Sequence, residues 1–144
     1  MMEYIVVENN FIISTDKNKI NIGYVHDFLS HSYWSPGVQM ETVTKAMNGS
    51  LCFGVYDNDK QIGYARMVTD TATFAYLADV FIDENYRGKG LGKWLVKVIL
   101  AHPDLQGLRR IMLATRDAHA LYEQVGFIAI NNPERYMVYD PKKL

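Results

Sequence analysis

The chain has 144 residues, of which 49% are hydrophobic and 22% charged, and its net charge is −1. This length suits one domain with one core, so we expect a single domain over residues 1–144. The near-zero net charge argues against a protein that binds nucleic acid through a broad basic face. No apolar run approaches the roughly 18 to 20 residues of a membrane span, so we expect no membrane partner.

The N-terminal segment MMEYIVVENNFII lacks the basic start, apolar block and small cleavage residues of a signal peptide. Cys52 is the single cysteine, which excludes an internal disulfide and any Cys-x-x-Cys metal or redox site. It stands in the apolar run LCFGVY, where we expect a buried, unreactive thiol rather than a nucleophile. These features predict a cytoplasmic protein without a metal site.

The first third of the chain predicts one strand and two helices. NFIIST at residues 10–15 is a strand candidate. Apolar residues at helical spacing predict a helix over 22–32, and the proline and glycine of SYWSPG at 32–37 end it. A second short helix is predicted over 38–48, with Asn48-Gly49 as its stop signal.

The pattern then changes to strands. Residues 51–69, LCFGVYDNDKQIGYARMVT, predict a strand, a polar turn and a second strand. A break at 69–71 leads to TFAYLADVFID, a third strand candidate over 73–83 that is rich in aromatic and β-branched residues. Three consecutive strands with short turns predict an antiparallel meander.

Helices and strands alternate in the last third. A helix follows the glycines near residue 90, and we then expect a strand over 109–115 and a helix over 117–126 with Asp117 as its N-cap. Two final strands are expected near 127–130 and 136–139. The predicted fold is therefore α/β (α+β), with a mixed, largely antiparallel central sheet and helices on both faces.

The segment ENYRGKGLGKWLV at 84–96 contains three alternate glycines where a strand meets a helix. An apolar stripe from Leu91 to Ile99 marks that helix. The first N–H groups of a helix have no partner within it, so they attract anions, and glycine lets a phosphate approach the backbone closely. One glycine would be enough for a turn. Three of them, with Arg87, Lys89 and Lys93 nearby, favour an anion-binding cradle.

Two common phosphate motifs do not fit this cradle. A P-loop needs GxxxxGK[ST], but Lys93 stands five residues after Gly88. The third glycine comes one residue too early for the dinucleotide fingerprint GxGxxG. The pattern that does fit is R-x-x-G-x-G over residues 87–92, after a strand and at the start of a helix.

At these residues the chain resembles the GNAT superfamily of acyl-CoA-dependent N-acetyltransferases, whose pyrophosphate-binding signature is [RQ]-x-x-G-x-[GA]. DVFIDENYRGKGLGKWLV at 79–96 is similar to the strand, loop and helix of that motif throughout. AHALYEQVGF at 118–127 resembles a later motif of the family, A-x-x-LY-x-x-x-GF. The resemblance covers most of the chain from about residue 50 and implies a sheet that splays between its fourth and fifth strands, a strand over 110–114 being the fifth.

The resemblance implies acetyl-CoA as co-substrate and assigns it a binding surface. The strand residues Val80, Phe81 and Ile82 would pair with the pantetheine arm. The pyrophosphate would lie on the loop, where Arg87 shapes the turn and the other contacts come from Gly88, Lys89, Gly90, Leu91, Gly92 and Lys93. Thr115 stands where the family often has asparagine, and its hydroxyl could bond the pantetheine.

The resemblance also places Tyr122 at the usual position of the general acid, which would protonate the departing thiolate. The alternative is a core aromatic beside Leu121. Asp79 is a candidate base, although strand alternation turns it away from the active face unless a bulge intervenes. A water chain, an amine that arrives neutral, or His119 are the alternatives.

The acceptor amine is expected against the N-terminal helices, where Tyr24, His31, Tyr33 and Trp34 cluster in the sequence. Tyr33 and Trp34 would bind it by stacking or cation–π contact, or would instead pack beneath their loop. The predicted function is direct transfer of an acetyl group from acetyl-CoA to a primary amine of a small molecule or peptide, by a protein that could be a homodimer. A non-catalytic acyl-CoA-binding module is the alternative, and an ATP-binding protein would need a magnesium-binding hydroxyl that the loop lacks.

Overall fold

A computed structural model describes residues 3–143 and contains one six-stranded sheet in the order β1-β2-β3-β4-β5-β6. Neighbouring strands are antiparallel except β5 and β6, which are parallel. The strands are β1 (Ile5–Glu8), β2 (Phe11–Ser14), β3 (Leu51–Asp57), β4 (Lys60–Thr69), β5 (Phe74–Ile82) and β6 (Arg110–Met112). The mixed, largely antiparallel sheet of the sequence prediction is confirmed.

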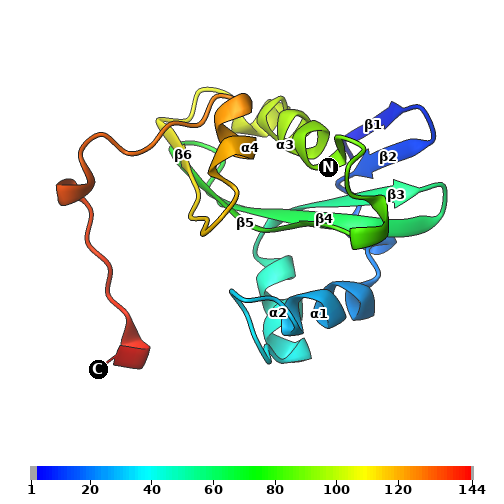
Figure 1. Cartoon of the computed structure of the whole chain (residues 1–144), viewed down its shortest axis with the longest axis horizontal. Coiled ribbons are helices and arrows are strands. Elements are labelled where there is room, and N and C mark those ends of the chain that lie inside the picture. The colour runs from blue at the N-terminus through cyan, green and yellow to red at the C-terminus, as the bar shows by residue number, and fades with distance from the viewer. Residues whose placement is uncertain (1–2, 144) are drawn as a thin grey trace.

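Helices cover both faces of the sheet, as Figure 1 shows. Helices α1 (Ile22–Ser30) and α2 (Met40–Asn48) lie on one face, and α3 (Leu91–Leu100) and α4 (His119–Gln124) lie on the other. Short 3-10 turns complete the chain, at η1 (Lys17–Lys19), η2 (Glu84–Tyr86), η3 (Pro103–Leu105), η4 (Pro133–Arg135) and η5 (Pro141–Lys143). No helix among residues 3–143 has the length and apolar character that crossing a bilayer requires.

Two apolar layers hold the helices against the sheet. The layer under α3 contains Leu95 and Ile99 from the predicted helical stripe, both fully buried against Phe53 and Met67 of the sheet. The layer under α1 and α2 contains Val25, Leu29, Val43 and Met47, together with Cys52. Each helix thus buries the face that its apolar spacing predicts.

The structure differs from the sequence prediction near both ends of the chain and at the strand predicted over 109–115, which forms only over Arg110–Met112. Strand β1 was not predicted; it pairs with β2 across a tight turn in which Asn9 has φ +57°. Asn9-Asn10 is a recognisable turn signal between two apolar runs, and it could have revealed this hairpin. The strands expected near 127–130 and 136–139 are not formed, because residues 127–140 contain only η4.

The sheet opens between β5 and β6. Strand β6 pairs with β5 only along Phe74–Tyr76, so the six following residues of β5 have no strand partner on that side within residues 3–143. The chain after Met112 continues away from β5 as an irregular segment. Because β1 was not predicted, β5 and β6 are the fourth and fifth strands of the sequence prediction. The opening therefore lies where the family resemblance places the splay, and it borders a cavity.

Candidate active site

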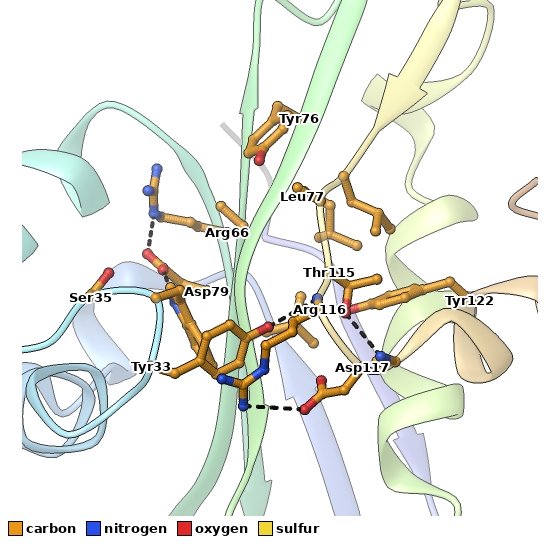
Figure 2. Close-up of a pocket in the computed structure, with 16 residues that line it drawn as sticks. Tyr33, Ser35, Arg66, Tyr76, Leu77, Asp79, Thr115, Arg116, Asp117 and Tyr122 are labelled. Atoms are coloured by element: carbon orange, nitrogen blue, oxygen red, sulfur yellow. Dashed lines mark hydrogen bonds and ion pairs between the residues drawn. The ribbon is translucent and has the colours of Figure 1, made fainter. Parts of the chain in front are cut away.

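A cavity of about 500 Å³ lies in the opening between β5 and the segment that follows β6. Its walls come from four places: the loop after α1, strands β4 and β5, residues 113–118, and α4. Figure 2 shows Arg66 and Asp79 on the side of the strands that faces the loop with Tyr33 and Ser35, and Thr115 and Tyr122 on the side of the segment after β6; all of them line the cavity. Charged and aromatic side chains thus meet in one cavity although their positions span the chain.

Asp79 enters this cavity because β5 contains a bulge. Ala78 pairs with Arg66 and Phe81 pairs with Tyr64, so Asp79 and Val80 together lie opposite the single residue Ala65. Asp79 has φ +55°, in the left-handed region that aspartate tolerates better than most residues. The bulge rotates its side chain onto the face that carries Arg66, which regular alternation would not do.

Both oxygens of the Asp79 carboxylate accept hydrogen bonds. Arg66 Nε lies 2.6 Å from Oδ2 in an ion pair, and Trp34 Nε1 donates to Oδ1 at 2.8 Å. The sequence prediction missed Arg66. The available signal was its position between apolar residues in the strand KQIGYARMVT, since a charge among buried residues requires a partner.

The loop after α1 bridges the cavity from one wall to the other. Trp34 reaches Asp79 on β5, while the Tyr33 hydroxyl accepts a hydrogen bond from Arg116 N at 3.3 Å. The Arg116 guanidinium also lies 3.8 Å from the centre of the Tyr33 ring. Arg116 therefore occupies one face of the Tyr33 ring, and no sequence pattern indicated this contact.

The four aromatic and histidine residues expected near the acceptor do come together. Tyr24, His31, Tyr33 and Trp34 all line a second cavity of about 420 Å³ beside α1, and Tyr33 and Trp34 separate it from the first. Both of these residues are about half exposed rather than buried under their loop.

Tyr122 projects from α4 toward Thr115 and lines the cavity with only 8% of its surface exposed. Burial raises the pKa of its phenol, and the nearby Tyr33 raises it further. The hydroxyl therefore stays protonated at neutral pH. Its ring packs edge-on against Phe127 at 5.7 Å, so the residue is also part of the core.

Helix α4 begins differently from the prediction. Asp117 is not its N-cap: the cap position is Ala118, which makes no side-chain capping bond, and the helix spans His119–Gln124 rather than 117–126. Thr115 Oγ1 instead accepts from Ala118 N at 3.0 Å, and Asp117 lies beside Arg116 at 3.6 Å. The Thr115 hydroxyl thus holds the turn before α4 and still has its own proton to donate.

The glycine loop has the backbone that an anion cradle needs. Gly88 and Gly90 have φ +82° and +78°, and a Cβ built on either would meet nothing within 4 Å. Gly90 is the N-cap of α3 and provides no side-chain cap, so the N–H groups of the first turn face outward. Arg87 Nε donates to the Ile82 carbonyl at 3.3 Å and ties the loop to the end of β5.

Gly92 has a different role from the other two glycines. It lies inside α3, where a Cβ would make ordinary contacts of 3.8 Å with Leu121 and 4.0 Å with Ile82. Leu91 beside it is buried, whereas Lys89 is exposed and Lys93 half-buried at the same helix end. The backbone therefore requires glycine at positions 88 and 90, whereas the structure has room for a Cβ at Gly92.

The last residues of β5 divide their side chains between the two layers. Phe81 stacks on Phe28 of α1, with ring centres 3.8 Å apart and planes 5° apart. Ile82 packs in the layer under α3, and Val80 packs against the edge of that layer. The side chains are thus anchored in the protein, while the backbone edge on the β6 side lacks a strand partner among residues 3–143.

Two other candidates lie outside this arrangement. His119 is exposed on α4 and is absent from the cavity wall. Cys52 is fully buried on β3, with Sγ 3.4 Å from both the Met47 carbonyl and the Tyr64 hydroxyl. Burial raises the pKa of the Cys52 thiol, which agrees with the expected unreactive cysteine.

Comparison with known proteins places the chain in a family. The model of the acetyltransferase (GNAT) family matches residues 22–127, which include the cradle, the bulge and Tyr122. This chain belongs to the GNAT family. It is an acyltransferase with the family's N-acetyltransferase fold.

Three similar proteins agree with this assignment. A protein from Xanthomonas campestris pv. campestris, whose crystal structure is described as a GNAT-family acetyltransferase, is 42% identical to this chain. The two structures superpose with a TM-score of 0.88, and the match covers 94% of this chain and 96% of that protein's chain. A protein of Pyropia yezoensis named as an N-acetyltransferase is 30% identical over 90% of this chain and 77% of its own length. The spermine/spermidine N(1)-acetyltransferase of Bacillus subtilis is 36% identical to this chain, and the match covers 67% of this chain and 60% of its own length.

Proposed function

We propose that residues 1–144 act as one N-acetyltransferase domain that moves an acetyl group from acetyl-CoA directly to the primary amine of a small molecule or peptide. The observation that carries this proposal is the meeting of Tyr122, Asp79 and the unpaired edge of β5 in one cavity, next to a bare helix N-terminus. The names of the relatives favour transfer over the alternative of a binding-only module.

The cradle fits the pyrophosphate of the donor. Gly88 and Gly90 bend the backbone so that successive N–H groups of the loop and α3 converge, and nothing stands above them. Arg87, Lys89 and Lys93 add positive charge at the same place. The donor supplies the activated thioester, and the free edge of β5 at Val80, Phe81 and Ile82 offers backbone groups that can hold its pantetheine arm beside Thr115.

Three groups of the chain would then serve the transfer. An N–H of the β5 edge, such as that of Val80, polarises the acyl carbonyl. The amine attacks this carbon, the C–N bond forms and the C–S bond breaks, and Tyr122 gives its proton to the departing sulfur. Because the Tyr122 phenol stays protonated at neutral pH, the proton is available when the sulfur leaves.

Asp79 is the carboxylate placed to receive the proton of the amine. The bulge turns it into the cavity, and each of its oxygens keeps a lone pair beyond the bonds to Arg66 and Trp34. His119 is too exposed and lies outside the cavity wall. We therefore assign the base role to Asp79, directly or through one water.

The charges of the cavity favour an acceptor with a single amine. Arg66 and Arg116 stand among its lining residues opposite the carboxylates of Asp79 and Asp117, so the wall has no net excess of negative charge for a polycation. Arg116 already covers one face of Tyr33, which leaves the other face and Trp34 for stacking on the acceptor.

The function is tested by release of free thiol from acetyl-CoA in the presence of a panel of amines: amino acids, peptides, aminoglycosides and spermidine. We expect turnover with a monoamine that exceeds turnover with spermidine. Because Cys52 is buried, the thiol reagent detects only the free coenzyme A that the reaction releases. Donor binding without turnover on any amine would instead support the binding module.

The cradle is tested by Gly90→Val, because a β-branched residue is strained at φ +78° and its side chain would stand where the phosphates bind. We expect acetyl-CoA affinity to fall at least about 100-fold in calorimetry, by analogy with the loss of several charge-assisted hydrogen bonds. Gly107→Val is the matched control, since Gly107 has φ +77°, nothing within 4 Å and a position far from the cradle. Unchanged affinity in Gly90→Val would refute the cradle.

The acid role is tested by Tyr122→Phe, which removes one hydroxyl and keeps the packing against Phe127. We expect kcat to fall by roughly 10²- to 10⁴-fold, the usual contribution of a general acid, with acetyl-CoA binding nearly unchanged. Tyr56→Phe is the control. Its hydroxyl is buried on β3 without a hydrogen-bond partner within residues 3–143, so its removal should leave kcat and folding intact. An unchanged kcat for Tyr122→Phe would contradict the acid role and leave Tyr122 only its packing role in the core.

The base role is tested by Asp79→Asn, since asparagine also tolerates the left-handed backbone and can still accept from Trp34. We expect kcat/KM for the amine to fall roughly 10²-fold or more at neutral pH. The loss should shrink as the pH approaches the pKa of the amine, because a neutral amine needs no base. Asp59→Asn, on the exposed turn between β3 and β4, controls for the change of charge. A loss that does not depend on pH would make Asp79 a positioning residue for Arg66 and Trp34.

A further inference from the structure

Two arginines line the cavity beside β5, and they differ in how their hydrogen-bond donors are used. Arg66 donates Nε to Asp79 at 2.6 Å and Nη1 to Ser50 Oγ at 3.3 Å. The Arg116 side chain donates no hydrogen bond within residues 3–143, and only its backbone N does, to Tyr33. Arg116 therefore brings a charged group with uncommitted donors to the cavity wall.

The one ion pair of Arg116 within residues 3–143 is weak. Its partner is the adjacent Asp117, and the nitrogen and oxygen lie 3.6 Å apart, which is too long for a hydrogen bond. The two side chains are 65% and 64% exposed, so water screens their attraction. A guanidinium carries five N–H donors in a planar fork that matches a carboxylate. Arg116 can thus bind a further carboxylate without breaking a hydrogen bond of its own.

Tyr33 orders this guanidinium before any ligand arrives. Arg116 Cζ lies 3.8 Å from the centre of the Tyr33 ring, and the Tyr33 hydroxyl accepts from Arg116 N at 3.3 Å, as Figure 2 shows. The cation–π contact and the backbone hydrogen bond hold both ends of the residue against one ring. An arginine that is already ordered loses less conformational entropy when it binds a ligand.

Two adjacent aromatic residues connect Arg116 to the assigned base. Trp34 Nε1 donates to the Asp79 carboxylate at 2.8 Å, while Tyr33 carries the Arg116 guanidinium. The centres of these two aromatic side chains lie only 5.1 Å apart. The carboxylate that would receive the amine proton and the uncommitted guanidinium therefore stand at two ends of one short aromatic surface.

We propose that the acceptor carries a carboxylate as well as its primary amine, and that Arg116 binds this carboxylate through two parallel hydrogen bonds. The proposal rests on the proposed function and narrows its acceptor to amino acids and short peptides. In this reaction Arg116 is a specificity residue: it holds the acceptor and transfers no proton.

The charge of the cavity agrees with such an acceptor. Its lining residues include two arginines and two aspartates, so their formal charges cancel. A free amino acid is a zwitterion, which brings one charge of each sign and no net charge. Its ammonium group would lie toward Asp79 and its carboxylate toward Arg116, so each end meets a group of opposite sign.

The acceptor class is tested with pairs of amines that differ by one carboxylate: phenylalanine with phenethylamine, and γ-aminobutyrate with propylamine. We expect kcat/KM for thiol release from acetyl-CoA to be at least about tenfold higher for the carboxylate member of a pair, since a hydrogen bond to a charged group is worth about that factor. Dipeptides with free and amidated C-termini show whether peptides qualify as well as free amino acids. Equal or better turnover of the amines without a carboxylate, or a preference for 2-aminoethyl phosphate over β-alanine, would overturn the proposal.

Arg116→Gln tests the residue itself, and comparing the two members of a pair in one variant removes the effect of their different basicities. We expect kcat/KM for the amino acid to fall roughly 10- to 100-fold through KM, without a fall for the matching amine or a change in the KM of acetyl-CoA. Arg116→Lys keeps the charge without the fork and should lose less. Arg109→Gln removes an exposed charge outside the cavity and should behave as wild type. An equal loss for both amines, or a raised KM for acetyl-CoA, would contradict carboxylate binding by Arg116.

Binding measured without turnover separates this proposal from acetyl transfer. Saturation-transfer NMR records phenylalanine and phenethylamine on the full chain in the presence of coenzyme A, in wild type and Arg116→Gln. A phenylalanine signal that Arg116→Gln removes, with no turnover of any amine, would support the carboxylate site and refute the transfer. Turnover without a carboxylate preference would refute the carboxylate site and leave the transfer standing. If no carboxylate-bearing amine gives a signal or turnover, the carboxylate site is wrong.

Discussion

Arg66 puts a permanent positive charge in a strand whose neighbours Ala65 and Met67 are fully buried, and this charge must be compensated inside the protein. Asp79 compensates it only because the β5 backbone takes φ +55° and bulges opposite Ala65. The left-handed conformation costs about 1–3 kcal/mol, while a hydrogen bond to a charged group contributes about 1.5–3 kcal/mol, and the Asp79 carboxylate accepts two. The ion pair can therefore maintain the bulge, and the bulge in turn positions Trp34 and with it the loop that crosses the cavity.

The two substrates of the proposed reaction would meet different kinds of surface. The donor surface is made of backbone: the bare N–H groups at the start of α3 and the free edge of β5. The acceptor surface is made of side chains on three separate segments, around Trp34, Arg66 and Arg116. Backbone geometry depends on a few glycines and repeats from protein to protein, whereas a side-chain surface changes with every substitution.

This difference explains how much could be predicted from the sequence. The stripe from Leu91 to Ile99, the stop at Gly49 and the glycine loop are local signals, and the structure agrees with each of them. Sequence reasoning also identified the condition under which Asp79 would face the cavity, and the bulge fulfils it. The pairing of Arg66 with Asp79, and the contact of Arg116 with Tyr33, join residues far apart in the chain. No local pattern encodes such contacts.

The failed predictions have local causes. Aspartate is a common N-cap, but here the Thr115 hydroxyl accepts the hydrogen bond from Ala118 N. The helix therefore begins at His119, two residues after Asp117. The strands predicted over 127–130 and 136–139 have strand-like composition, yet a strand forms only by pairing with another, and these residues pair with none within residues 3–143. Residues 127–140 leave their own sheet, so composition alone could not determine their conformation.

The stack of Phe28 on Phe81 joins the two halves of the site mechanically. Phe81 belongs to β5, whose backbone edge is the proposed donor surface, and Phe28 belongs to α1, which lines the second cavity beside Tyr33 and Trp34. Separating two flat rings that stack 3.8 Å apart would lose their contact, so the stack ties the movement of β5 to that of α1. In the proposed reaction, a displacement of β5 by acetyl-CoA would pass through this stack to the acceptor side, and an acceptor coupled in this way would change donor affinity by the same factor.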